Sequence, residues 1–110
     1  MRKIDEEDIH KAVAWLRDTA QHCAEARATR LYLDAFTKSL KAILMSKYNE
    51  LPISAQEREA YSDDEYVKHL KALRIAVERD EKNRYLRESA MVKIETHIWL
   101  NVVSLHQVIL

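Results

Sequence analysis

The sequence predicts an all-α protein built around a long antiparallel helical hairpin. Its 110 residues include no glycine and one proline, the residues that tight turns and helix C-caps normally use. Strong helix formers such as Ala, Leu, Glu, Lys and Arg are abundant. Two long segments also repeat apolar residues in steps of three and four, the spacing of one helix face. We expect a single domain spanning residues 1–110.

The first predicted helix runs from about residue 6 to about residue 49. Acidic residues crowd its start, where they complement the helix dipole, and Asp5 is the expected N-cap. No helix breaker follows before Pro52. The apolar stripe of this helix moves to an adjacent face near Arg27, which predicts a phase shift or a slight bend there.

The turn region is predicted in the segment that follows, which contains Pro52. Two capping-box patterns occur in it, at Ser54 with Glu57 and at Ser62 with Glu65. They predict a short helix over about 55–61.

The second long helix is expected over about 63–100, followed by an apolar C-terminal extension. Folding the chain back at the turn brings polar residues of the two long helices opposite each other, which supports the hairpin. These residues are Arg27, Arg30, Asp34, Asp80, Glu81 and Arg84.

Charge and chemistry exclude several classes of function. Because the net charge is +0, a nucleic-acid site must be a local patch. The five histidines show no metal-ligand spacing, and without glycine there is no phosphate-binding loop. The lone Cys23 is expected to be a buried apolar residue. We therefore expect no catalytic residue, no metal and no cofactor.

The N-terminus lacks the apolar core of a secretion signal, and the apolar C-terminus is too short to span a membrane. These features predict a cytoplasmic protein with no membrane partner.

A basic strip is the main candidate for a binding site. Two stretches without acids, 35–49 and 66–77, face each other across the predicted hairpin. Aromatic residues interleave them, and Tyr48 and Tyr66 are candidates for base stacking, as in single-strand binders. The alternative is an ordinary solvated helix face. In that interpretation Arg27, Arg30 and Arg84 form ion pairs with Asp34, Asp80 and Glu81. The predicted nucleic-acid-binding residues are Lys38, Lys41, Lys47, Lys68, Lys71, Arg74, Arg27 and Arg30.

The C-terminal segment 97–110 is predicted to be an oligomerisation tail. Its apolar face is wider than one partner helix can cover, which predicts a homo-oligomer. The alternative is that the tail packs only on the start of the first helix. The predicted interface residues are Ile98, Trp99, Val102, Leu105 and Ile109.

The run RATRLYLDAFTKSLKAILM, the turn LPISAQEREAYSDDEY and the helix that follows resemble small helical phage and prophage proteins of recombination gene clusters, over about Ala26 to Thr96. In layout the chain is also similar to phage recombination mediators of the UvsY type. This resemblance implies binding of single-stranded DNA and assembly through the C-terminal helix. It also implies a role in loading a recombinase onto strands covered by single-strand-binding protein.

We therefore expect a non-enzymatic single-stranded DNA-binding protein of phage recombination or replication, acting in the host cytoplasm. Its expected partners are single-stranded DNA, further copies of itself, and a recombinase or single-strand-binding protein. The alternatives are a phage accessory or inhibitor protein that acts by protein contact only, and a structural coiled-coil adaptor. Salt-dependent binding to an oligonucleotide separates the first function from the other two.

Overall fold

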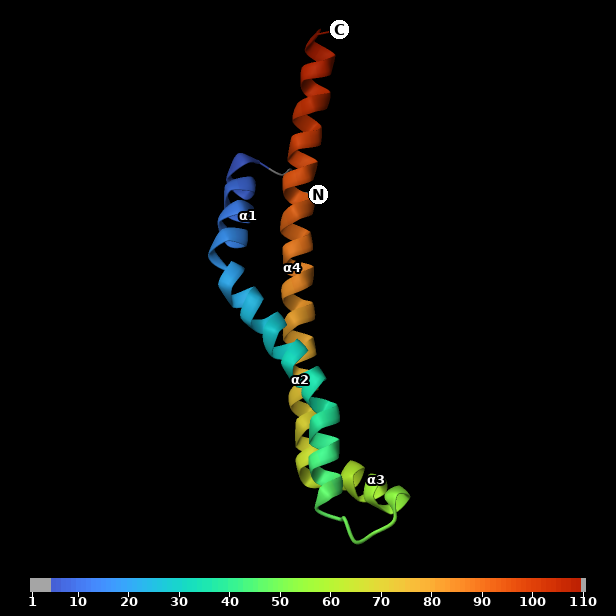
Figure 1. Cartoon of the computed structure of the whole chain (residues 1–110). Helices are drawn as coiled ribbons and strands as arrows, with labels where there is room; N and C mark the ends of the chain where they lie inside the picture. The colour runs from blue at the N-terminus through green and yellow to red at the C-terminus, as the bar shows by residue number, and fades with distance from the viewer. Residues whose placement is uncertain (1–4, 110) are drawn as a thin grey trace. The chain divides into compact units, whose positions relative to one another are not determined.

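The computed structural model describes the backbone of residues 5–109 and the side chains of residues 5–107. Within that range the protein is all-helical and contains no strand, as the sequence predicts. The helices, labelled in Figure 1, are α1 (Glu6–Asp18), α2 (Ala20–Ser46), α3 (Ile53–Ser62) and α4 (Asp64–Ile109).

The chain forms two compact units, which we describe separately. The hairpin unit is Ala24–Asp80. The terminal unit combines Met1–Cys23 with Glu81–Leu110. Both α2 and α4 continue from one unit into the other.

The start of α1 confirms the predicted N-cap. Asp5 has an extended backbone, and its Oδ1 accepts a hydrogen bond of 2.9 Å from the backbone N–H of Asp8. The Asp8 carboxylate in turn accepts the Asp5 N–H at 3.2 Å. This reciprocal pair is a capping box, which satisfies backbone donors that have no partner inside the helix.

The first long helix is interrupted at Thr19, where the sequence predicts a continuous helix over 6–49. The Thr19 hydroxyl donates to the backbone carbonyl of Trp15 at 2.6 Å, and the Thr19 N–H donates to the same carbonyl at 3.0 Å. A hydroxyl that shares the carbonyl four residues back loosens the helical ladder and bends helices. The helical segment also ends earlier than predicted, at Ser46.

The helix starts after the turn differ from the predicted capping boxes. Pro52 occupies the N-cap of α3 and provides no side-chain hydrogen bond, and Ser54 lies inside the helix. At the start of α4 the capping side chain is Asp63, whose Oδ1 accepts the Glu65 N–H at 2.8 Å. Ser62 is the last residue of α3, and its hydroxyl donates instead to the carbonyl of Arg58 at 3.0 Å. Both capping-box predictions are therefore wrong.

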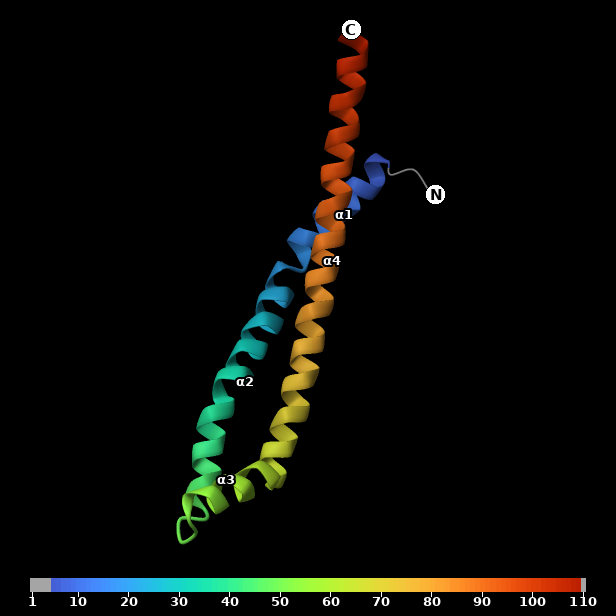
Figure 2. The same ribbon diagram turned by 90° about the vertical axis from the view of Figure 1, so that its right-hand side faces the viewer.

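In the hairpin unit, α2 and the part of α4 up to Asp80 run antiparallel (Figure 2). Their buried and half-buried positions recur in steps of three and four, as in a coiled coil. The stripe on α2 keeps its phase through Arg30, so the predicted phase shift near Arg27 is wrong. The positions are Ala26, Arg30, Leu33, Thr37, Leu40 and Leu44 on α2, and Tyr66, His69, Leu73, Ala76 and Asp80 on α4.

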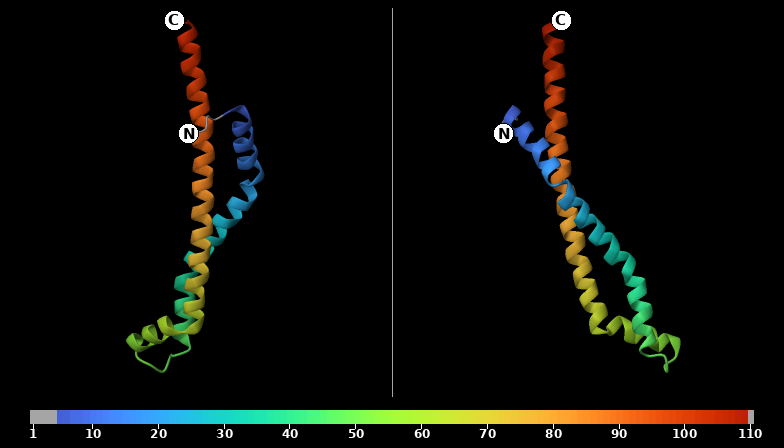
Figure 3. Two further views of the ribbon diagram at one scale, coloured as in Figure 1. Left: turned by 180° about the vertical axis from the view of Figure 1, so that it is seen from behind. Right: turned by 60° about the vertical axis from the view of Figure 1, so that its left-hand side comes forward.

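An apolar core closes the turn end of the hairpin unit. Leu44 and Ala60 are fully buried there, and Leu40 and Tyr66 complete the cluster. Ala60 comes from α3, which bridges the ends of α2 and α4 (Figure 3). Burial of a small side chain lets α3 pack closely, so this short helix holds Glu57 beside Lys41 of α2.

In the terminal unit, α1 lies beside α4, and the last turns of α4 extend past it (Figure 1). Ala12, Cys23 and Ala90 are buried in this unit. Val13 is 46% exposed because the buried stripe lies one residue earlier, at Ala12. No helix within residues 5–109 is both long and apolar enough to cross a membrane.

Candidate nucleic-acid interface

Four predicted phosphate-binding residues are exposed cations of the hairpin unit. They lie outside the buried stripe, so their charged ends stay in water. None of them forms an ion pair with any residue in the described range 5–109. Arg27 is exposed on α2 in the same way. The four residues are Lys38 on α2, and Lys68, Lys71 and Arg74 on α4.

Lys41 belongs to a different environment, against α3. Its Nζ lies 3.4 Å from Oε1 of Glu57 and 4.7 Å from the centre of the Tyr61 ring. Hydrogen bonding to Tyr61 raises the pKa of Lys41 above its ordinary value, and Glu57 adds to this effect while desolvation opposes it. Lys41 therefore stays charged, but an acid and an aromatic ring already hold its ammonium.

Lys47 is also held by acids. Its Nζ lies 3.4 Å from Oε1 of Glu65 and 3.9 Å from Oδ2 of Asp63. The Tyr48 hydroxyl donates to the same Asp63 oxygen at 3.4 Å. The turn between α3 and α4 therefore places its carboxylates against the basic end of α2.

The two predicted stacking residues offer little free ring surface. Tyr66 is only 9% exposed and packs edge-on against Tyr61, with 5.3 Å between ring centres. Tyr48 is half-buried. The most exposed ring among the described residues of this unit is Tyr32, which stacks on Phe36 with an interplanar angle of 9° and keeps 66% of its surface exposed.

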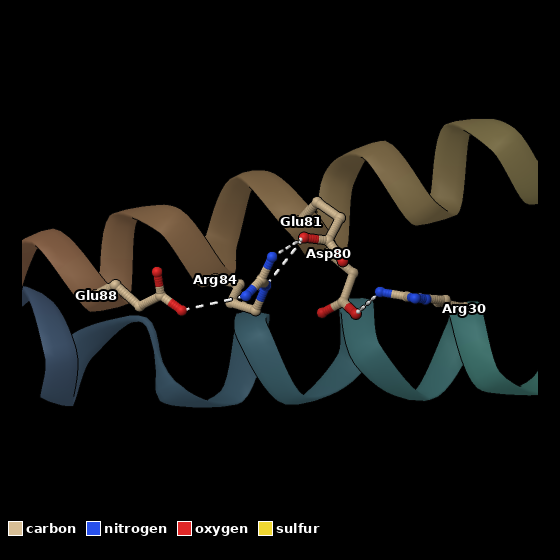
Figure 4. A network of polar contacts seen from close by, with 5 residues as sticks. All are labelled: Arg30, Asp80, Glu81, Arg84 and Glu88. Carbon is tan, nitrogen blue, oxygen red and sulfur yellow. Dashed lines mark hydrogen bonds and ion pairs between the residues drawn. The ribbon is translucent and has the colours of Figure 1, made fainter.

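Arg30 is part of the buried stripe of the hairpin unit. Its Nη1 donates to Oδ2 of Asp80 at 3.0 Å, which is the ion pair that the alternative interpretation of the sequence predicts (Figure 4). The Asp80 side chain is 5% exposed. Arg30 is therefore held between the helices and does not join the exposed cations.

Another polar contact of this stripe joins Thr37 and His69. The Thr37 Oγ1 lies 2.8 Å from Nε2 of His69, which is buried, and 3.1 Å from the carbonyl oxygen of Leu33. A hydroxyl carries one proton, so if it donates to Leu33, His69 must donate to it from Nε2. The sequence analysis did not predict this pair. Its signal is the seam spacing, because Thr37 lies seven residues before Leu44 and His69 lies three residues after Tyr66.

In the terminal unit, Arg84 forms a local ion-pair network on α4 (Figure 4). Its Nε and Nη2 donate to Oε2 of Glu81 at 2.9 and 2.6 Å, and Nη1 donates to Glu88 at 3.2 Å. The hydrogen bonds to Glu81 are the largest cause of the raised pKa of Arg84. The predicted pair of Arg84 with Glu81 is present.

The predicted tail residues lie on α4 and are exposed. Ile98, Trp99, Val102 and Leu105 keep between 53% and 64% of their surface in solvent. Ile109 is the last residue of α4, but its side chain lies outside the described residues.

No cluster of three or more metal-binding side chains occurs among the described residues. Cys23 is a free, buried cysteine.

Comparison of the chain with protein-family models, with curated proteins and with solved structures finds no match.

Proposed function

We propose that the protein is a non-enzymatic single-stranded DNA-binding protein of phage recombination or replication, acting in the cytoplasm of the host. The observation that supports DNA binding is a group of exposed cations that form no ion pair with the residues that the structure describes, namely Lys38, Lys68, Lys71 and Arg74. Exposed lysine and arginine side chains neutralise phosphates and release counterions, which provides affinity without reading the sequence. The phage setting, and a role in loading a recombinase, follow from the resemblance described above.

The structure narrows the residues that we assign to this role. Lys41, Lys47 and Arg30 contact acids of the hairpin unit, so we leave them out of the primary phosphate-binding group. Tyr66 is buried and is replaced by Tyr32 as the stacking candidate. An exposed aromatic ring on the same unit as exposed lysines is a combination that binds unpaired bases without sequence preference.

The direct test is binding of a fluorescently labelled single strand, measured by anisotropy at increasing salt. We expect the affinity to fall with salt, and Lys68→Gln with Lys71→Gln to reduce the log–log slope by about 1.4, at about 0.7 for each phosphate contact. The matched control is Lys82→Gln with Lys93→Gln, two exposed lysines elsewhere on α4, which should leave the slope unchanged. Failure of the unmodified protein to bind at low salt, or an equal loss in the control, would overturn the proposal.

A second candidate is action by protein contact only, as an accessory or inhibitor protein or as a coiled-coil adaptor. The exposed apolar residues Ile98, Trp99, Val102 and Leu105 favour it, because contiguous apolar surface marks interaction sites. This function becomes the leading one if the single strand does not bind.

A further inference from the structure

The terminal unit carries a second apolar row on α4, separate from the stripe that packs beside α1. The buried positions of α4 in this unit include Asn83 and Ala90. One residue further along, Met91, Ile98 and Leu105 recur every seven residues and remain 45%, 56% and 64% exposed. A shift of one residue turns a helix by about 100°, so this row lies on a different face from the stripe.

The intervening positions of the row are Glu95 and Val102. They alternate with Met91, Ile98 and Leu105 in steps of four and three, which is the pattern of a coiled-coil seam. The residues of the row therefore have the spacing of a helix face that packs against another helix. Within the described part of the chain, the apolar side chains of the row remain exposed.

A groove of about 650 Å³ lies beside the beginning of this row. It is lined by the apolar side chains of Leu16, Met91 and Val92 and by the charged side chains of Arg84, Arg87, Glu88 and Glu95. Leu16 comes from α1, so both helices of the terminal unit contribute to the groove. An apolar helix can dock in such a groove, with its own apolar residues against Met91 and Val92.

The chain itself contains a segment of matching chemistry. Residues 96–107 of α4 include no Asp, Glu, Lys or Arg, whereas residues 84–95 carry charges of both signs. The uncharged segment can lie along the groove without bringing a charge of its own beside these charged side chains. The row is thus divided into a charged half that borders a groove and an uncharged half.

This asymmetry determines the direction of pairing. In a parallel pair, Glu95 of each copy would face Glu95 of the other copy within the seam, and like charges at that position repel each other. In an antiparallel pair the charged half of each helix faces the uncharged half of its partner, so Glu95 lies near Asn101 and away from the Glu95 of the other copy. Avoidance of this repulsion favours the antiparallel arrangement.

We propose that two copies of the chain pair through this outer row, with their α4 helices antiparallel. Ile98 lies at the centre of the pair, and Leu105 of one copy packs near Met91 of the other. The pairing is two-fold symmetric, because each copy provides the same row. It does not depend on DNA binding, so the two proposals can fail separately.

The orientation is tested with introduced cysteines and a short bismaleimide cross-linker, in a Cys23→Ala background that removes the native thiol. A mixture of Met91→Cys and Leu105→Cys proteins should give a cross-linked dimer of one chain of each kind. Neither variant alone should cross-link. In the antiparallel pair, position 91 of one copy lies about 14 residues along the helix axis from position 91 of the other, or about 21 Å at 1.5 Å per residue. The same separation holds for the two copies of position 105. Cross-linking of Met91→Cys to itself would show a parallel pair and overturn the proposal.

The role of the outer row is tested by sedimentation of charge variants. Val102→Glu should convert the dimer to a monomer. The matched control is Ser104→Glu, which introduces the same charge on the same exposed segment, about 200° around the helix. It should leave the dimer intact, and circular dichroism should show equal helicity for both variants. A monomeric unmodified protein, or a Val102→Glu protein that remains dimeric, would contradict the proposal.

Discussion

The guanidinium of Arg30 donates from Nη1 to Oδ2 of Asp80 at 3.0 Å, across the two helices of the hairpin unit. The Asp80 side chain is 5% exposed, and its other carboxylate oxygen is buried without a hydrogen bond among the described residues. A buried carboxylate with incomplete hydrogen bonding depends on its cation, since the charge otherwise carries a large desolvation cost.

We predict that Arg30→Met lowers the free energy of unfolding by about 3 kcal/mol, the lower end of the range for a broken buried pair, because Arg30 is partly exposed. Adding Asp80→Leu should recover most of that loss, since the double variant buries no charge. Urea unfolding at one fixed protein concentration measures both effects. The control Arg74→Met, at an exposed position, should change stability by less than about 0.5 kcal/mol. A double variant no more stable than Arg30→Met would show that the pair is not the cause.

The contact of Thr37 with His69 leads to a second stability prediction. Thr37→Val keeps the shape of the side chain but removes the oxygen that lies 2.8 Å from Nε2 of the buried imidazole. We expect a loss of about 1 to 3 kcal/mol, the cost of a buried polar group without a partner. Thermal unfolding should show that Thr37→Ser, which retains a hydroxyl, loses less.

The matched control for this test is Thr29→Val, an exposed position on the same helix. It makes the same chemical change, so helix propensity affects both variants alike. Equal losses at Thr37 and Thr29 would assign the effect to propensity and remove the hydrogen bond as its cause.

The polar residues in the buried stripe explain which parts of the fold were predictable. Helix formers, the missing glycines and the single Pro52 predicted an all-helical hairpin and the position of its turn, and the structure confirms both. Apolar residues alone do not show the phase of the stripe around Arg27. Arg30 and Thr37 occupy seam positions, so the stripe continues through polar side chains that find partners on α4.

The candidate site was predictable only in part, because exposure depends on tertiary contacts. Spacing along each helix correctly placed Lys38, Lys68 and Lys71 on the surface. It could not reveal that α3 brings Glu57 against Lys41, since residues 16 apart in sequence meet only after the turn folds. Burial of Tyr66 likewise follows from the packing of α3 through Ala60.

The ion pairs of Lys41 and Lys47 lead to the last prediction, which depends on the proposed function. Glu57 on α3 lies 3.4 Å from the ammonium group of Lys41, and Glu65 on α4 lies 3.4 Å from that of Lys47. Glu57→Gln with Glu65→Gln removes these two carboxylates and leaves the longer 3.9 Å contact of Lys47 with Asp63, so both ammonium groups become more available to phosphates. We expect tighter binding of a labelled single strand, with a log–log salt slope steeper by up to about 1.4 if both lysines gain a phosphate contact.

The control separates ion pairing from a general change in charge. Glu50→Gln with Glu59→Gln alters the net charge equally in the same region, but neither acid pairs with a lysine among the described residues. Anisotropy titrations at several salt concentrations should therefore show a larger gain for the Glu57 and Glu65 pair. Screening of surface charges beyond about 10 Å at 0.1 M salt limits what the control variant can contribute. If both double variants bind equally, Lys41 and Lys47 lie away from the path of the strand, and the exposed cations of α2 and α4 account for binding without them.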